Sequence, residues 1–70
     1  SIIRYLKIFN IMFDYALEND EIGVDHLHSI YENINDSLCT LIDDVDTDQT
    51  VKETAQYTKN RFQEDESNAD

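Results

Sequence analysis

The stretch from Ile2 to Leu17 constrains this chain most, because it is apolar over most of a helical surface. At about 100° per residue, its apolar side chains cover roughly two-thirds of a helix circumference, and a polar stripe about 120° wide covers the rest. The polar stripe consists of Arg4, Lys7, Asn10, Asp14 and Glu18. Its members recur at intervals of three and four residues rather than two, which favours a helix over a strand. Such a helix is either the central helix of a bundle or a helix shared between subunits.

A second helix follows a cluster of turn-forming residues around Gly23, the only glycine, which should end the first helix near Asn19. The second helix is predicted from about Asp25 to about Asp44 and has a one-sided apolar stripe. The members of that stripe are Leu27, Ile30, Tyr31, Ile34, Leu38, Leu41, Ile42 and Val45. A linker of about five residues would let the first two helices form an antiparallel hairpin.

A third helix is predicted from about Thr50, which has capping-box spacing with Glu53, to about Gln63. Its apolar stripe is thin and consists of Val51, Ala55, Thr58 and Phe62, with Tyr57 to one side. We therefore expect this helix to pack weakly or to lie against the first helix of another chain. Residues 64–70 are acidic and small, and we expect a disordered tail there and a single helical domain over residues 1–63.

The predicted fold is all-α, an antiparallel helical hairpin with a short third helix. Seventy residues make one small domain. Because the first helix has more apolar surface than the other two can cover, we expect a helical-bundle homodimer. The residues expected at its interface are Ile3, Ile8, Met12 and Tyr15. The alternative is a monomeric three-helix bundle.

The chain is strongly acidic, with a formal net charge of −11 and no Lys or Arg between Ile8 and Val51. Direct binding to nucleic acid or to an anionic membrane is not expected, because neither polyanion would be attracted. The natural complement is a basic protein surface or a cation. The lone cysteine, Cys39, excludes an internal disulfide, and the sequence has no signal-peptide pattern or membrane-length apolar run. We therefore expect a soluble cytoplasmic protein.

The outer face of the second helix is predicted to carry a line of carboxylates at spacings of 7, 4 and 7 residues. This spacing places them within about 40° of one another along roughly 27 Å of helix. The line consists of Asp25, Glu32, Asp36 and Asp43, and it is extended after the helix by Asp44, Asp46 and Asp48. No Lys or Arg is near enough in sequence to pair with them. The line is either a solvated face or an anionic surface that imitates a nucleic-acid backbone and docks on a basic groove.

The acidic segment after the second helix partly matches the pattern of a calcium-binding loop. Asp44, Asp46 and Asp48 fit positions 1, 3 and 5 of a calcium-binding loop. However, Gln49 stands where the loop needs glycine, and Ala55 stands where it needs a bidentate glutamate. We therefore assign no metal site and keep only weak divalent-cation binding as an alternative.

The remaining reactive side chains do not form a catalytic pattern. His26 and His28 are two residues apart and point in different directions on a helix, so they cannot chelate one metal. We expect His28 to pair locally with Glu32 or Asp25. Cys39 has no histidine placed as an adjacent base. The sequence also lacks a glycine-rich phosphate loop, and we expect no cofactor and no enzymatic activity.

These features predict a non-enzymatic acidic protein–protein interaction module. Its anionic helix face would dock on a basic, nucleic-acid-binding protein, so that the chain acts as a small regulator or inhibitor. The first alternative is a structural or assembly subunit that uses the apolar first helix as its interface. The second is a weak divalent-cation-binding helical protein.

Overall fold

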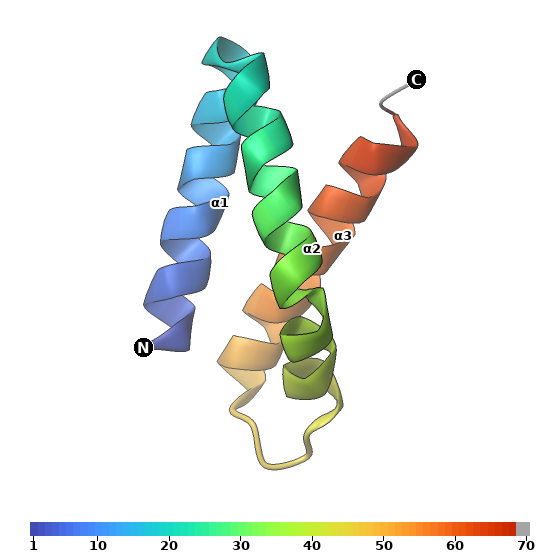
Figure 1. Ribbon diagram of the computed structural model, residues 1–70. Helices are drawn as coiled ribbons and strands as arrows, with labels where there is room; N and C mark the ends of the chain where they lie inside the picture. The colour runs from blue at the N-terminus through green and yellow to red at the C-terminus, as the bar shows by residue number, and fades with distance from the viewer. Residues whose placement is uncertain (69–70) are drawn as a thin grey trace.

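The computed structural model describes residues 1–68, and within them the chain forms three helices and no strand (Figure 1). The helices are α1 (Ile2–Asn19), α2 (Glu21–Asp43) and α3 (Gln49–Ser67). The predicted all-α class is confirmed, as is the end of the first helix near Asn19. Figure 1 shows α1 and α2 joined at one end of the molecule and running in opposite directions, and each of the three helices contacts the other two.

A single residue, Asp20, joins α1 to α2, where the sequence suggested a linker of about five residues. Asp20 is extended, with φ −157° and ψ 91°, and its N–H donates to the carbonyl of Ala16 over 2.9 Å. Gly23 lies inside the first turn of α2 and does not end α1. A Cβ at this position would lie 2.7 Å from Asp20 Oδ2, so the glycine makes room for that carboxylate. The second helix therefore begins at Glu21 rather than near Asp25.

The C-terminal end of α3 extends to Ser67, beyond the predicted end near Gln63. The structure thus differs from the predicted disordered tail at residues 64–67, and residues 69–70 lie outside the described residues. A contact with α2 explains the difference. Asp65 Oδ2 lies 2.6 Å from His28 Nε2, so the last turns of α3 are held against the neighbouring helix.

The core is an aromatic cluster centred on Phe62, which is fully buried. Its ring stacks on Phe13 at 4.0 Å between centroids, on Tyr31 at 4.8 Å and on Phe9 at 5.1 Å. The ring of His28 meets it edge-on at 5.0 Å. The structure contradicts the expectation that the third helix packs weakly, because this one aromatic side chain contacts both α1 and α2. The apolar stripe of α3 has few members, but its largest member occupies the centre of the domain.

A polar network inside the core ties α1 to α3. Asn10 Nδ2 donates to Thr58 Oγ1 over 2.8 Å, and the Thr58 hydroxyl donates to the carbonyl of Thr54 over 2.9 Å. Arg61 donates to the carbonyl and side-chain oxygens of Asn10 and, over 2.5 Å, to Asp14 Oδ1. Part of the polar stripe of α1 therefore faces α3 rather than solvent. Buried polar groups that are satisfied in this way specify one arrangement of the two helices.

Candidate interaction surfaces

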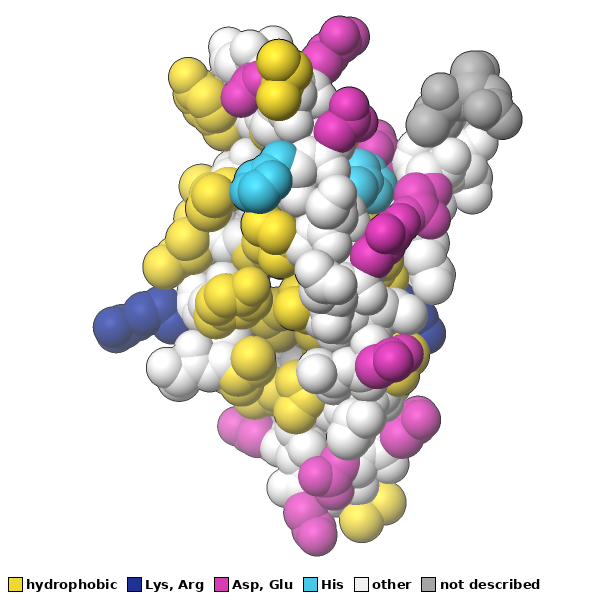
Figure 2. Space-filling view, in the orientation of Figure 1, with side chains coloured by type: hydrophobic (Ala, Val, Ile, Leu, Met, Phe, Trp, Pro, Cys, Tyr) yellow, Lys and Arg dark blue, Asp and Glu magenta, His cyan; other side chains and the backbone are white. Residues whose placement is uncertain are grey.

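The outer face of α2 carries four exposed carboxylates on one side of an uninterrupted helix. We call this surface the acidic strip, and it consists of Asp25, Glu32, Asp36 and Asp43. Within residues 1–68, the carboxylates in ion pairs are Asp14, Asp65 and Glu66, and none of them belongs to the strip. Figure 2 shows acidic side chains spread along the molecule and gathered at both of its ends. All four charges of the strip therefore remain available to a partner.

The loop between α2 and α3 extends the strip with three more exposed carboxylates, Asp44, Asp46 and Asp48. The Asp46 N–H donates to Asp44 Oδ1 over 2.9 Å. This backbone hydrogen bond, together with one from the Thr47 side chain and the charge of Lys52, lowers the pKa of Asp44 from its ordinary value of 3.8. The folded loop therefore favours the charged form of this carboxylate.

The calcium-loop pattern does not become a metal centre in the described part of the chain. No three His, Cys, Asp or Glu side chains among residues 1–68 are grouped so that they could hold a metal ion. Gln49 begins α3, and Ala55 is fully buried in the core. The position that would supply the bidentate glutamate of a calcium loop therefore faces inward, away from the acidic loop.

Three of the four residues predicted for the dimer interface share one exposed side of α1, and the fourth does not. Ile8, Met12 and Tyr15 are exposed on α1, whereas Ile3 is half-buried. Helical geometry places Ile3 about 120–180° around the helix from the other three, so it belongs to a different side. Ile11, which the prediction did not include, is also exposed, near Ile8 and Tyr15 on the helix surface. A helical wheel places Ile11 nearly opposite the apolar residues of α1 that are buried in the core.

An apolar groove follows the seam between α1 and α2 on a side that α3 does not line. One section, of about 370 Å³, lies between Met12 and Tyr15 of α1 and Leu27 of α2. The next section, of about 220 Å³, lies between Ile8 of α1 and Ile30 of α2. Apolar side chains are visible along this part of the surface in Figure 2. The exposed side of α1 thus continues into a shallow apolar depression.

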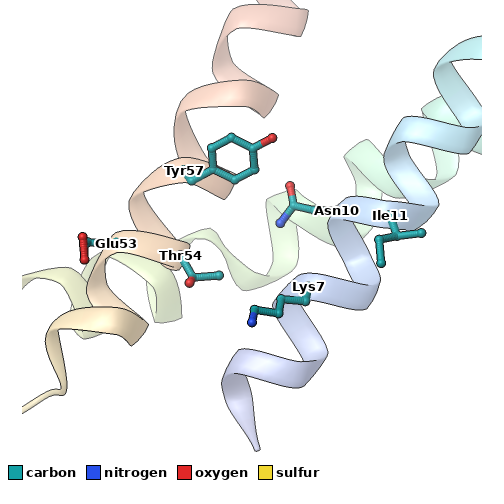
Figure 3. Close-up of a pocket in the computed structure, with 6 residues that line it drawn as sticks. All are labelled: Lys7, Asn10, Ile11, Glu53, Thr54 and Tyr57. Carbon is teal, nitrogen blue, oxygen red and sulfur yellow. The ribbon is translucent and has the colours of Figure 1, made fainter.

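A second depression lies between α1 and α3 and has a volume of about 400 Å³. Figure 3 shows its lining, which is Lys7, Asn10, Ile11, Glu53, Thr54 and Tyr57. Its charged groups, Lys7 and Glu53, come from different helices. The Thr54 hydroxyl donates to the Thr50 carbonyl of its own helix over 2.9 Å. The lining contains no histidine or cysteine to serve as a base or nucleophile, so this depression offers contact area.

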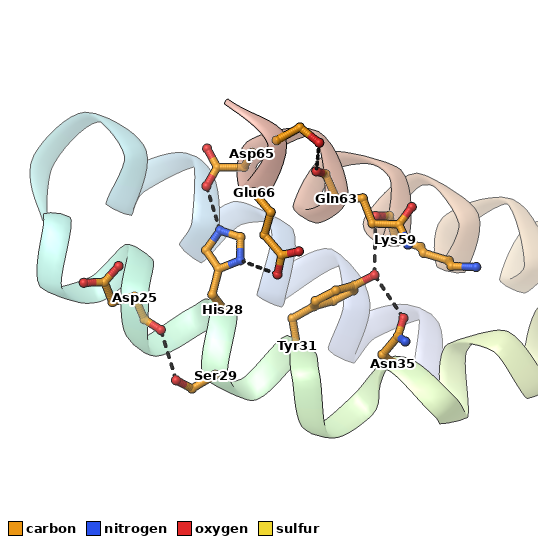
Figure 4. Close-up of polar contacts among 10 residues, drawn as sticks. Asp25, His28, Ser29, Tyr31, Asn35, Lys59, Gln63, Asp65 and Glu66 are labelled. Atoms are coloured by element: carbon orange, nitrogen blue, oxygen red, sulfur yellow. Dashed lines mark hydrogen bonds and ion pairs between the residues drawn. The ribbon is translucent and has the colours of Figure 1, made fainter. Parts of the chain in front are cut away.

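His28 does not pair with Glu32 or Asp25, as the sequence suggested, but with the end of α3. Figure 4 shows its ring between Asp65 and Glu66, with Nε2 2.6 Å from Asp65 Oδ2 and Nδ1 3.7 Å from Glu66 Oε1. The local prediction failed because the side chain turns inward toward Phe62 rather than along its own helix.

Tyr31 links the same two helices next to His28. Its hydroxyl donates to Asn35 Oδ1 over 3.0 Å and to the Lys59 carbonyl over 3.5 Å (Figure 4). Burial raises the pKa of the Tyr31 hydroxyl above its ordinary value of 10.0, and the nearby charge of Glu66 adds to the effect. The hydroxyl is therefore a structural hydrogen-bonding group that stays protonated.

The chain matches no protein-family model, no curated protein and no solved structure. Within residues 1–68, none of the helices has an apolar run that would reach across a bilayer. Two surfaces of the molecule are candidates for contact with a partner, the acidic strip of α2 and the exposed apolar side of α1.

Proposed function

We propose that this protein is a non-enzymatic acidic interaction module whose acidic strip docks on a basic surface of another protein. The observation that carries the proposal is that four carboxylates lie exposed along one face of α2 and that none of them is in an ion pair within residues 1–68. Along a helix of this length the strip extends over roughly 27 Å. It offers spaced negative charges to a groove that normally binds a polyanion such as nucleic acid. By occupying that groove, the chain would act as a regulator or inhibitor.

The end of α2 adds support. Asp43 closes the helix, and Asp44, Asp46 and Asp48 follow it, with no basic residue in the last turn. The helix dipole disfavours an exposed anion at this end by about 0.3–1 kcal/mol. Asp43 thus carries its charge where the helix dipole opposes it, as expected of a surface that serves binding rather than stability.

Charge reversal tests this proposal. The variant Glu32→Lys/Asp36→Lys alters the centre of the strip, and Glu53→Lys/Glu64→Lys is the matched control, with the same charge change at exposed positions of α3. Each immobilised protein is offered a cell lysate at low salt and eluted with a salt gradient. We expect the wild type and the control to retain a basic nucleic-acid-binding protein that leaves at moderate salt and is displaced by nucleic acid, and the strip variant to lose it.

Two results would count against the strip. Equal loss with both variants would mean that net charge alone is sensed. A partner that stays bound at high salt would mean that apolar contacts hold it, which is the behaviour of an assembly subunit.

The exposed apolar side of α1 supports a second function, in self-assembly. We propose that the chain forms a homodimer through Ile8, Met12 and Tyr15, the three predicted interface residues that share an exposed side. Apolar patches of this kind on small domains are typical of interaction sites. The arrangement would combine one dimer-forming helix, α1, with one partner-binding helix, α2.

A further inference from the structure

The outermost line of α1 is an apolar seam with a basic residue at one end and an acidic residue at the other. We call this line the α1 crest, and it consists of Arg4, Ile8, Ile11, Tyr15 and Glu18. Its spacings of 4, 3, 4 and 3 residues are those of helices that pack along one another. All five side chains are exposed, and the central three have 51%, 65% and 67% of their surface accessible. The middle of the line that faces away from the core of α1 is therefore apolar, and its two ends are charged.

The crest is self-complementary about Ile11. Arg4 lies seven residues before Ile11 and Glu18 seven residues after it. When two copies of α1 lie antiparallel about a two-fold axis at Ile11, each Arg4 faces Glu18 of the other copy and the apolar residues meet at the centre. In a parallel pair, arginine would face arginine and glutamate would face glutamate. The charges on the crest therefore favour the antiparallel direction.

The charge of the whole helix points the same way. α1 has two basic and two acidic residues, so it has no net charge in a chain whose net charge is −11. α2 has five acidic residues and no basic one, and α3 has four acidic and three basic residues. Bringing together two copies of α1 therefore avoids the repulsion that any contact between two copies of α2 would meet.

We propose that a second copy of this chain docks on the α1 crest, forming an antiparallel two-fold dimer in which two Arg4–Glu18 ion pairs flank an apolar centre at Ile11. The proposal rests on the dimerisation proposed above and adds its direction and register. Tyr5 and Met12, which line the α1–α2 groove beside the crest, supply further apolar contact.

Single and double charge reversals test the register. Arg4→Glu and Glu18→Arg each replace two attractive pairs with two repulsive ones, and we expect each variant to dimerise about tenfold more weakly in sedimentation experiments at moderate salt. The double variant R4E/E18R restores both pairs with their signs exchanged. We expect its dimerisation constant to return to within about twofold of the wild-type value. In a parallel dimer the single variants would not weaken association, because like charges already face each other there.

The position of the interface is tested by Ile11→Glu, with Val45→Glu as the matched control. Val45 is an exposed apolar residue of the α2–α3 loop, so its variant has the same change of charge away from the crest. We expect I11E to weaken dimerisation by about a hundredfold or more and V45E to change it less than about twofold. Both side chains are exposed in the monomer, so the helical content by circular dichroism should not change.

Each outcome separates this inference from the proposals above. A wild-type protein that remains monomeric at high concentration overturns the dimer and this inference together, and the strip is judged separately by E32K/D36K. A dimer that survives I11E overturns the α1 crest as its interface. A dimer that I11E disrupts but that R4E and E18R leave unchanged overturns the antiparallel register alone.

Discussion

Truncating Phe62 to alanine should remove most of the stability of this domain. The fully buried ring contacts Phe9 and Phe13 of α1 and His28 and Tyr31 of α2, so its loss opens a cavity among all three helices. Replacing a buried phenylalanine with alanine costs about 3–5 kcal/mol. A chain of this length is stable by roughly 4–10 kcal/mol in total. The variant should therefore retain only a small free energy of unfolding, or none.

Urea denaturation followed by far-ultraviolet circular dichroism measures this loss. With a denaturant dependence of about 1 kcal/mol per molar, the midpoint should fall by roughly 3–5 M. Tyr57→Ala is the matched control, because it truncates an aromatic residue of the same helix that is 57% exposed. It should cost less than about 1 kcal/mol. If the two variants lose similar amounts, Phe62 is not the centre of the core and α3 does not pack on its own chain as described.

Three further substitutions probe the contacts between helices. Thr58→Val removes the hydroxyl that accepts a hydrogen bond from the Asn10 amide, so a buried donor loses its partner. The variant should lose about 1–3 kcal/mol of unfolding free energy in urea denaturation. An unchanged midpoint would contradict the polar network. The raised pKa of Tyr31 contributes stability that is fully present below the ordinary value of 10.0 and is lost as pH rises through the raised value. Tyr31→Phe should therefore flatten the decline in unfolding free energy at alkaline pH, and a decline identical to that of the wild type would refute this. Asp65→Asn weakens the contact with His28 and should speed hydrogen exchange of the last amides of α3 several-fold while leaving those of α1 unchanged; uniform rates would mean that this end of α3 is not held.

Local patterns in the sequence predicted the helices well. The end of α1 near Asn19 and the apolar stripe of α2 depend on neighbours within one or two turns, which periodicity captures. Val45 is the exception in that stripe, because α2 ends at Asp43 and leaves it 87% exposed in the loop. The predicted role of Gly23 in ending the first helix was wrong, because the sequence alone does not fix what a glycine does. A glycine can end a helix or make room for a neighbouring side chain, and only the geometry of Asp20 distinguishes the two.

Contacts between distant residues were not predictable in the same way. Asn10 belongs to a polar stripe that a helical wheel assigns to solvent, but it donates to Thr58, 48 residues later. His28 has two carboxylates near it in sequence and pairs instead with Asp65, 37 residues away. The acidic strip could be predicted because it depends on one helix alone. The four predicted interface residues do not share one exposed side, because Ile3 is half-buried and the other three are exposed.

The one-residue joint at Asp20 also bears on how quickly this chain folds. Bringing α1 against α2 closes almost no loop, so the entropic cost of their first contact is small. The connection from α2 to α3 is also short, and helical domains built from such near-neighbour contacts fold in microseconds to milliseconds. The chain contains no proline, so no slow prolyl isomerisation is expected. We therefore expect a single fast kinetic phase in which the α1–α2 pair forms early and the docking of Phe62 between the two helices completes the domain.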